Sequence, residues 1–379
     1  MAIYKDNKAT KDGRTWYYLV YKKDNVGNNK KYKSKRYLTK KEAQQAEAAF
    51  LLKRDNPINK PFYLVAEDYF NHLSNIRKES TLFSYETAYK HNIVPYFKDF
   101  NLNDINVSNI TNWKNMMDKK QYKVAYKNKL YTVFNEIFKF AIKSYGFNYN
   151  PVHMVGRFEN KNEEVNDENK KIRYITHDEF NKFISFIDDI QWKTFFIFLY
   201  YTGMRKGEVQ ALTWDKIDFE KKQILVNANL SVKTKDSTFK ITSTKNNQNR
   251  IIKMNNLLYE QLLIYKKQIM EYTDFSKSWF VFGCSRFLAS TTIDRYKHYY
   301  FNLADVKEIT IHEFRHSHVS LVINEYIKSS REKNIKIDTA KFFLMMSNRM
   351  GHTLEVMTKT YLHLFPTIQD EIVDLLDNL

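Results

Sequence analysis

The chain has 379 residues, a length that predicts two or three domains and excludes a single ordinary core. Its 43% hydrophobic and 16% aromatic content excludes global disorder, and its one cysteine, Cys284, excludes a disulfide framework. The formal net charge of +18 points to a polyanionic partner such as DNA or RNA, with a basic protein that lacks such a partner as the alternative. The polar N-terminus and short apolar runs predict no signal peptide and no membrane span, so we expect a cytoplasmic protein.

Residues 1–56 are expected to form a basic nucleic-acid-binding module. Residues 1–55 hold 15 Lys/Arg against 6 Asp/Glu, so half of the chain's excess charge lies in its first seventh. Aromatic and β-branched residues predict strands at 15–23 and 30–38, with a turn at 24–29. The Thr39-Lys40-Lys41-Glu42 segment is a capping box that begins a helix.

The next segment, 62–158, is predicted to be helical from apolar residues spaced three and four apart. Residues 119–129 interleave five lysines with Tyr122 and Tyr126, a pattern that fits either a solvated helix face or a phosphate-contacting surface. Residues 159–171 have one apolar residue among thirteen and are interpreted as a linker.

From residue 172 to the C-terminus we expect a mostly helical domain. A second capping box at 176–179 opens its first helix, and a β-region near 215–253 has strands at 223–226 and 250–253 around a polar stretch. At the C-terminus, 366–379 predicts a short amphipathic helix that carries acidic residues and no basic ones.

Four separated segments of this last domain carry chemically capable side chains. They supply Arg205 and Glu208; Lys245; His312, Arg315 and His316; and His352 followed by Tyr361. Each segment alone has a purely structural interpretation: a cation at a helix end, a solvated lysine, a histidine at a turn or a core tyrosine.

One of these segments, His312 to His316, also matches the H-E-x-x-H pattern of zinc hydrolases, in which two imidazoles one helical turn apart bind the metal. A metal-dependent hydrolase is therefore an alternative. It leaves the basic N-terminal module and the other three segments unexplained, so we expect no metal and no cofactor.

Taken together, the four segments suit chemistry on a phosphodiester. A tyrosine hydroxyl, with a pKa near 10, needs help to act as a nucleophile. Two arginines can stabilise the charge that gathers on the phosphate oxygens without a metal. A lysine can protonate the leaving sugar oxygen, and two histidines can donate to the phosphate or carry the nucleophile's proton.

The order and spacing of these motifs resemble the catalytic domain of the tyrosine recombinase (phage integrase) family over about residues 172–365. The motifs are T-G-x-R-x-x-E, a hairpin lysine, H-x-x-R-H, then G-H and a tyrosine nine residues later. The family usually has leucine where this chain has Phe314, a change in packing alone. The resemblance implies the following roles: Arg205 and Arg315 clamp the phosphate, Lys245 protonates the leaving 5′ oxygen, His312 is the acid/base partner, His352 hydrogen-bonds the phosphate, Tyr361 is the nucleophile, and Glu208 and His316 support them.

The lysine assignment has competitors, because Lys233, Lys235 and Lys240 lie in the same β-region. Lys245 is preferred because Thr244-Lys245 followed by Arg250-Ile251-Ile252 is most similar to the family's hairpin.

The N-terminal parts extend the resemblance. Residues 62–158 resemble the family's helical core-binding domain, and residues 1–56 resemble the arm-binding domain, a three-stranded sheet plus helix, of integrases from Gram-positive phages and mobile elements. The expected fold is thus mainly α with small β-sheets (α+β), ending in a mixed α/β catalytic domain at 172–379 with a C-terminal tail helix. Candidate DNA-binding residues are Lys33, Lys35, Arg36, Lys119, Lys120, Lys123 and Lys127.

The resemblance implies an integrase that recombines double-stranded DNA at core-type and arm-type attachment sites through a 3′-phosphotyrosine intermediate. A homotetramer on DNA, an excisionase, a host DNA-bending protein and a nucleoid location in a bacterial host belong to this expectation, with the tail helix docked on a neighbouring subunit or on its own domain. A resolvase or invertase, a type IB topoisomerase and a non-catalytic DNA-binding regulator remain alternatives.

Overall fold

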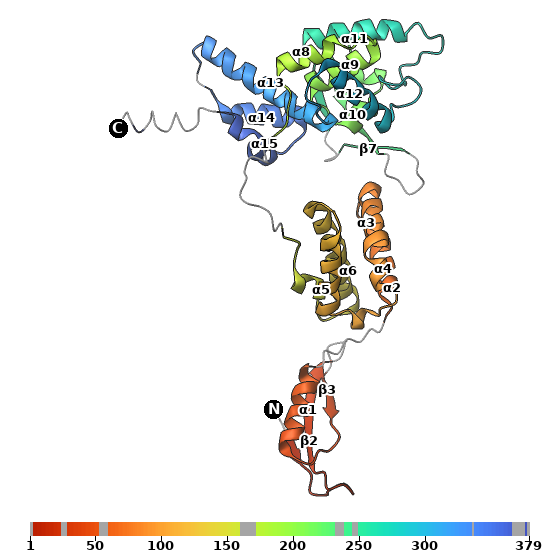
Figure 1. Cartoon of the computed structure of the whole chain (residues 1–379), viewed down its shortest axis with the longest axis vertical. Helices are drawn as coiled ribbons and strands as arrows, with labels where there is room; N and C mark the ends of the chain where they lie inside the picture. The colour runs from red at the N-terminus through yellow and green to blue at the C-terminus, as the bar shows by residue number, and fades with distance from the viewer. Residues whose placement is uncertain are drawn as a thin grey trace. The chain divides into compact units, whose positions relative to one another are not determined.

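The computed structural model describes residues 3–23, 29–52, 60–159, 172–231, 239–244, 249–335, 337–365 and 376. The chain divides into two compact units, Met1–Glu164 and Val165–Leu379 (Figure 1). Helices dominate and the sheets are small, which confirms the expected mainly α fold with small β-sheets. Lys245, most of the expected linker and nearly all of the expected tail helix lie outside the described residues.

The N-terminal part of the first unit is an antiparallel sheet of order β1-β2-β3 with one helix, as the sequence predicted. Its elements are β1 (Ile3–Lys5), β2 (Trp16–Lys23), β3 (Asn29–Lys33) and α1 (Lys40–Leu52). The alternation along β2 divides the sheet into two faces: Tyr18 and Val20 are buried on the side that α1 contacts, whereas Tyr17 and Tyr21 lie on the open side. The predicted capping box forms at the start of α1, where the Glu42 amide donates to the Thr39 hydroxyl.

The remainder of the first unit is helical. Its elements are α2 (Phe62–Ser74), α3 (Glu79–Asn92), α4 (Val94–Phe97), η1 (Leu102–Asp104), α5 (Val107–Lys119), α6 (Val124–Tyr145) and α7 (Pro151–Val155). Helix α6 contacts α2, α3 and α7. Phe62, at the start of α2, packs against Phe134 and Phe138 of α6, so the aromatic residues that gave the sequence its helical spacing form the core.

The second unit is built around α9 (Ile190–Thr202), which buries nine of its thirteen residues. It contacts α8 (His177–Ser185), α11 (Asn256–Ile269) and α13 (Ile311–Glu332). The other helices are α10 (Lys206–Gln210), η3 (Trp214–Lys216), α12 (Ser290–Ala304), α14 (Thr339–Met350), α15 (Leu354–Tyr361) and η4 (Leu362–Leu364). Thr176 and Glu179 form the predicted capping box of α8. Among the described residues, no helix is both long and apolar enough to cross a membrane.

The β-region of this unit is more complex than expected. The predicted strands at 223–226 and 250–253 exist as β5 (Gln223–Val226) and β8 (Arg250–Lys253), which pair with each other and with β4 (Ile217–Asp218). The polar stretch between them holds two further strands, β6 (Ala228–Ser231) and β7 (Lys240–Ser243), which form a separate antiparallel pair. In chain order, Lys245 therefore falls between β7 and β8, which belong to two different sheets and do not pair with each other.

A buried histidine of α13 ties this helix to α9 and α14. His318 Nδ1 donates to the Tyr200 carbonyl at 2.8 Å, and its Nε2 accepts a hydrogen bond from Arg349 Nε at 3.2 Å. Both ring nitrogens are therefore used by the neutral imidazole. Burial, and then the charge of Arg349, lowers the pKa of His318 to about 3.

We predict that His318 makes the second unit sensitive to acid. Its folded pKa of about 3 lies below the unfolded value of 6.5, so the unfolded chain binds the additional proton as the pH falls below 6.5. The contribution of neutral His318 to the free energy of unfolding is complete above pH 7. It decreases by up to about 1.4 kcal/mol per pH unit between pH 6.5 and 3. Urea unfolding at pH 7, 6 and 5 measures it.

The matched variant is His318→Asn, which keeps a donor toward Tyr200 and cannot titrate. It should be less stable than wild type at pH 7, because Arg349 Nε loses its acceptor, yet its unfolding free energy should depend less steeply on pH. Identical slopes for the two proteins would contradict the assignment.

Candidate active site

The first segment of the site begins where α9 ends. Gly203 ends the helix in the left-handed region (φ 62), and a Cβ at this position would lie 2.7 Å from His318 Cδ2. Only glycine allows both the turn and this close approach of α13. Arg205 then becomes the N-terminal cap of α10, and its guanidinium donates to Glu208 at 2.9 Å and to the Gly351 carbonyl at 2.9 Å.

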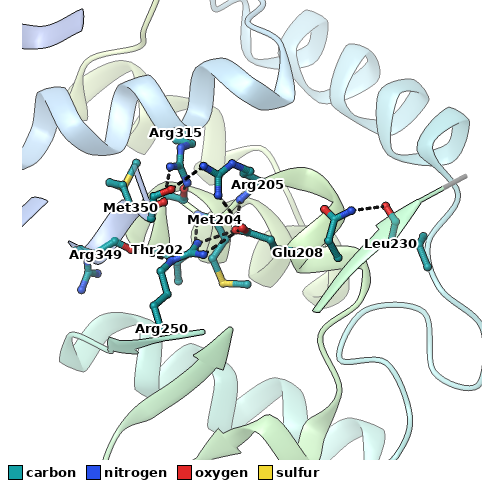
Figure 2. Close-up of polar contacts among 12 residues, drawn as sticks. Thr202, Met204, Arg205, Glu208, Leu230, Arg250, Arg315, Arg349 and Met350 are labelled. Carbon is teal, nitrogen blue, oxygen red and sulfur yellow. Dashed lines mark hydrogen bonds and ion pairs between the residues drawn. The ribbon is translucent and has the colours of Figure 1, made fainter. Parts of the chain in front are cut away.

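The carboxylate of Glu208 lies at the centre of this region and is 2% exposed (Figure 2). It accepts hydrogen bonds from the Arg205 side chain and main chain, and from both terminal nitrogens of Arg250 at 3.0 and 2.6 Å. Burial alone would raise the pKa of Glu208, but the bonds and charge of Arg250, aided by Arg205, hold this pKa at about 2. The carboxylate is therefore ionised and orients two guanidinium groups.

A third guanidinium belongs to Arg315 of α13, which is 1% exposed. Its terminal nitrogens donate to the main-chain oxygens of Gly203 and Met350, while its Nε has no hydrogen-bond partner among the described residues (Figure 2). Burial, and then the charge of Arg205, lowers the pKa of Arg315 to about 9. Burying a guanidinium without a carboxylate of its own is unfavourable unless an anion arrives.

The electrostatic imbalance of the cluster indicates what it binds. Arg205, Arg250 and Arg315 face one buried carboxylate, that of Glu208, so positive charge is in excess in a region of low dielectric. Guanidinium forks match the oxygens of phosphate, so this excess suits a phosphate group.

The hydroxyl of Tyr361 lies beside this cluster. Tyr361 ends α15 with a fully buried side chain, and its hydroxyl lies 2.6 Å from His316 Nδ1, on the residue that follows Arg315. Burial raises the pKa of Tyr361 to about 12, and the charge of Arg315 partly opposes this effect.

Two further histidines surround these groups. The ring of His312 meets that of His316 edge to face, with centroids 5.1 Å apart. His352 follows Gly351, and its Nδ1 lies 3.3 Å from the Met357 sulfur. Burial, and then the charges of Arg315 and Arg205, lowers the pKa of His352 to about 3, so this imidazole is neutral at physiological pH.

The H-E-x-x-H segment has a different use in this structure from that in a zinc hydrolase. The Glu313 carboxylate accepts a hydrogen bond from the Thr310 amide, and the Thr310 hydroxyl accepts one from the Glu313 amide, which together cap α13. His316 is engaged with Tyr361. The Glu313 side chain is therefore used to cap helix α13.

The structure brings together seven of the eight catalytic and supporting residues named from the sequence, all but Lys245: Arg205, Glu208, His312, Arg315, His316, His352 and Tyr361. The sequence reasoning missed Arg250, which it treated only as a flank of the lysine segment. No local signal could identify it, because Arg250 lies 42 positions from Glu208 in the sequence.

The basic residues predicted to contact DNA differ in their surroundings. Lys33, Lys35, Lys119 and Lys123 are exposed and Lys120 is partly buried. Arg36 pairs with Asp6 and donates to the Lys8 carbonyl at 3.0 Å. Lys127 is 7% exposed and bonds both the carboxylate and the carbonyl of Asp118 at 3.1 Å, so its ammonium group stabilises the helical unit and is directed away from solvent.

Three family descriptions match successive parts of the chain. Residues 3–53 match the arm DNA-binding domain, residues 62–117 match the phage integrase N-terminal SAM-like domain, and residues 173–330 match the phage integrase family. The chain belongs to the phage integrase family. It is therefore a tyrosine recombinase, an enzyme that cleaves and rejoins DNA strands.

A curated relative supports this assignment. The chain is 28% identical to the ICEBs1 integrase of Bacillus subtilis (strain 168) over 297 residues, which cover 76% of this chain and 74% of the relative. The catalytic family match ends at residue 330, so His352 and Tyr361 lie beyond it.

Solved structures of two integrases share the fold. The Tn1549 transposon integrase in complex with a circular intermediate DNA has a TM-score of 0.63 at 17% identity, covering 83% of this chain and 99% of that one. A lambda integrase tetramer bound to a Holliday junction has a TM-score of 0.51 at 16% identity, covering 89% and 92%.

We predict that Glu208→Gln lowers both the stability and the DNA-cleavage rate of the integrase. The amide keeps one acceptor oxygen and loses the charge shared by Arg205 and Arg250, and breaking a buried pair costs about 3 kcal/mol or more of unfolding free energy. Arg250→Met should give a similar loss, and the double variant should lose less than the sum.

The control is Asp215→Asn, which removes a surface ion pair with Lys216 and should change the unfolding free energy by less than about 1 kcal/mol. Chemical denaturation and single-turnover cleavage measure these effects. Wild-type stability and rate in Glu208→Gln would show that the carboxylate does not organise the arginines.

Proposed function

We propose that the integrase cuts DNA with Tyr361, which forms a 3′-phosphotyrosine while Arg205 and Arg315 hold the scissile phosphate. The observation that carries this proposal is the position of the Tyr361 hydroxyl. It lies 2.6 Å from the residue that follows Arg315, within the same described unit as both arginines.

The remaining residues complete the reaction by their chemistry. Arg205 and Arg315 stabilise the charge that develops on the non-bridging oxygens. Lys245 protonates the leaving 5′ oxygen, His312 acts in proton transfer and His352 donates to the phosphate. The phosphotyrosine bond conserves the energy of the phosphodiester, so rejoining requires neither ATP nor a metal ion.

The proposal includes cleavage in cis. The Tyr361 hydroxyl lies in the same described unit as the arginines of its own chain, so each subunit attacks the phosphate that it binds itself. A subunit that donated its tyrosine to a neighbour would hold this hydroxyl away from its own arginines.

The substrates in this proposal are the attachment sites of a mobile element. The similarity to the ICEBs1 integrase, which extends over 76% of the chain, and the separate basic module favour an integrase over a resolvase or invertase. Residues 62–158 would bind core-type sites and residues 1–56 arm-type sites. Four subunits would act together on DNA at the nucleoid of a bacterial host, with an excisionase and a host DNA-bending protein as accessory partners.

The open face of the N-terminal sheet is the proposed arm-site surface. Leu19 pairs with Lys33 and Tyr21 with Lys31, so these side chains share the face opposite α1. Lys33 Nζ lies 4.4 Å from the centre of the Tyr17 ring. Exposed lysines among aromatic rings on a small sheet suit docking in a DNA groove, where ammonium groups reach phosphates.

We predict that Tyr361→Phe abolishes the covalent adduct with nicked suicide DNA and leaves DNA binding nearly intact, because the hydroxyl alone is removed. Tyr299→Phe is the matched control, since this tyrosine is 56% exposed on α12, and its adduct should form normally. Arg315→Lys should also form no adduct, because an ammonium cannot supply the planar fork. Denaturing gels read out the adduct, and an adduct with the Tyr361→Phe protein would refute the proposal.

We predict that deleting residues 1–55 removes arm-site binding and spares cleavage at core sites. Within the full chain, Lys33→Ala should weaken arm-site binding and reduce its salt dependence by about one unit of log-log slope. Lys41→Ala, on the helix that covers the opposite face, is the control and should change neither. Equal arm binding by the truncated and full chains would contradict the assignment.

A further inference from the structure

His316, assigned only a supporting role from the sequence, contacts the hydroxyl of Tyr361 directly. Its Nδ1 lies 2.6 Å from the Tyr361 hydroxyl, and the phenol is otherwise buried in a core that includes Met350 and Met357. With no water-accessible surface on Tyr361, the phenolic proton has to pass to a neighbouring protein group or to the incoming DNA.

The need for such a group follows from the burial of the nucleophile. With a pKa of about 12, Tyr361 is a phenolate in about one molecule in 10⁵ at pH 7. A neutral phenol attacks phosphorus poorly, so its proton must leave as the bond forms.

The surroundings of His316 keep it able to accept that proton. Burial is the largest effect, and together with the neighbouring His312 and Arg315 it lowers the pKa of His316 to about 4. Glu313 opposes this effect. The imidazole is therefore neutral at pH 7. With the Tyr361 hydroxyl 2.6 Å from Nδ1, the neutral ring can accept the bond at Nδ1 in the tautomer that carries its own proton on Nε2.

We propose that His316 is the group that accepts the phenolic proton of Tyr361 during strand cleavage. In this step the phenolic O–H proton moves to Nδ1, the Tyr361 oxygen bonds to phosphorus, the P–O5′ bond breaks, and the 5′ oxygen takes a proton from Lys245. Rejoining reverses each transfer. This inference rests on the proposed function, since it requires Tyr361 as the nucleophile.

The charges at the site make this base depend on the substrate. An imidazolium at His316 is disfavoured in the free protein by Arg315 and by burial. A bound phosphate adds negative charge beside Arg315 and Arg205, which stabilises a nearby imidazolium. His316 thus accepts the proton when DNA is bound, and the free enzyme keeps a neutral phenol.

The test compares His316→Asn with His316→Ala on DNA that carries either an ordinary scissile phosphate or a 5′-bridging phosphorothiolate, whose sulfur leaves without a proton. Asparagine can accept the Tyr361 hydrogen bond but cannot hold its proton. On the ordinary phosphate, both variants should cleave about 100-fold or more slowly in a single turnover. Near-wild-type cleavage by His316→Asn would reduce the residue to positioning and overturn the proposal.

The phosphorothiolate separates the two ends of the reaction. It should restore cleavage to Lys245→Ala and should not restore it to His316→Asn, because the phenol still lacks an acceptor. Restoration of His316→Asn would overturn the proposal by placing the histidine at the leaving group. His363→Asn, an exposed histidine two residues beyond Tyr361, is the control and should cleave as wild type does.

Two measurements distinguish a failure of the proposed function from a failure of the role proposed for His316. If wild type forms no adduct with either DNA, or the adduct is not on Tyr361, the proposed function fails. Nitrogen-15 NMR of the full wild-type chain needs no variant that might misfold, and His316 Nδ1 should resonate as an unprotonated nitrogen. A protonated Nδ1 that donates to Tyr361 would overturn the inference.

Discussion

The unpaired carbonyl groups at the ends of two helices hold the active site together. The last turns of α9 and α14 leave main-chain oxygens without helical partners, and four arginine side chains satisfy them. Arg205 donates to the Gly351 carbonyl and Arg250 to the Arg349 carbonyl. Arg315 donates to the carbonyls of Gly203 and Met350, and Arg349 donates to that of Tyr201. The negative ends of both helices favour these cations, so the same contacts that complete the helices fix the guanidinium groups.

This arrangement gives the site a net positive charge. Carbonyl oxygens orient a guanidinium without cancelling its charge, and Glu208 is the only carboxylate that bonds Arg205 and Arg250 in the described part of the site. The cluster therefore retains a positive excess at a fixed geometry. Because the donors are already aligned, little reorganisation is needed when charge develops on a phosphate, which is the condition for efficient electrostatic stabilisation.

Local sequence signals were sufficient where the interaction itself is local. The boxes at Thr39 and Thr176 join residues three positions apart, and the strand pattern at 223–226 depends on simple alternation. These features, and the family motifs, predicted the mainly α fold and most of the candidate site.

Partners that are distant in sequence escaped prediction. Glu208 meets Arg250 across 42 positions, and His316 meets Tyr361 across 45, so no window of sequence contains both members of either pair. Residues 223–253 looked like one hairpin in the sequence, but β6 and β7 within this region pair with each other and form a separate sheet. Lys127 looked like a surface residue because the helix turns of Asp118 and Lys127 are brought together only by packing.

Along α14 and α15, the residues that hold the two arginines Arg205 and Arg315 come before those that hold the proposed nucleophile, Tyr361. The carbonyls that hold Arg205 and Arg315 belong to residues up to Gly351, where the chain turns in the left-handed region. Met357 and Tyr361 follow this turn and are buried in an apolar cluster with residues of α13 and α14, Met350 among them. The position of the nucleophile therefore depends on apolar packing and on His316, whereas the clamp depends on helix ends and Glu208. His316 and Arg315, adjacent on α13, are the point at which the two systems meet.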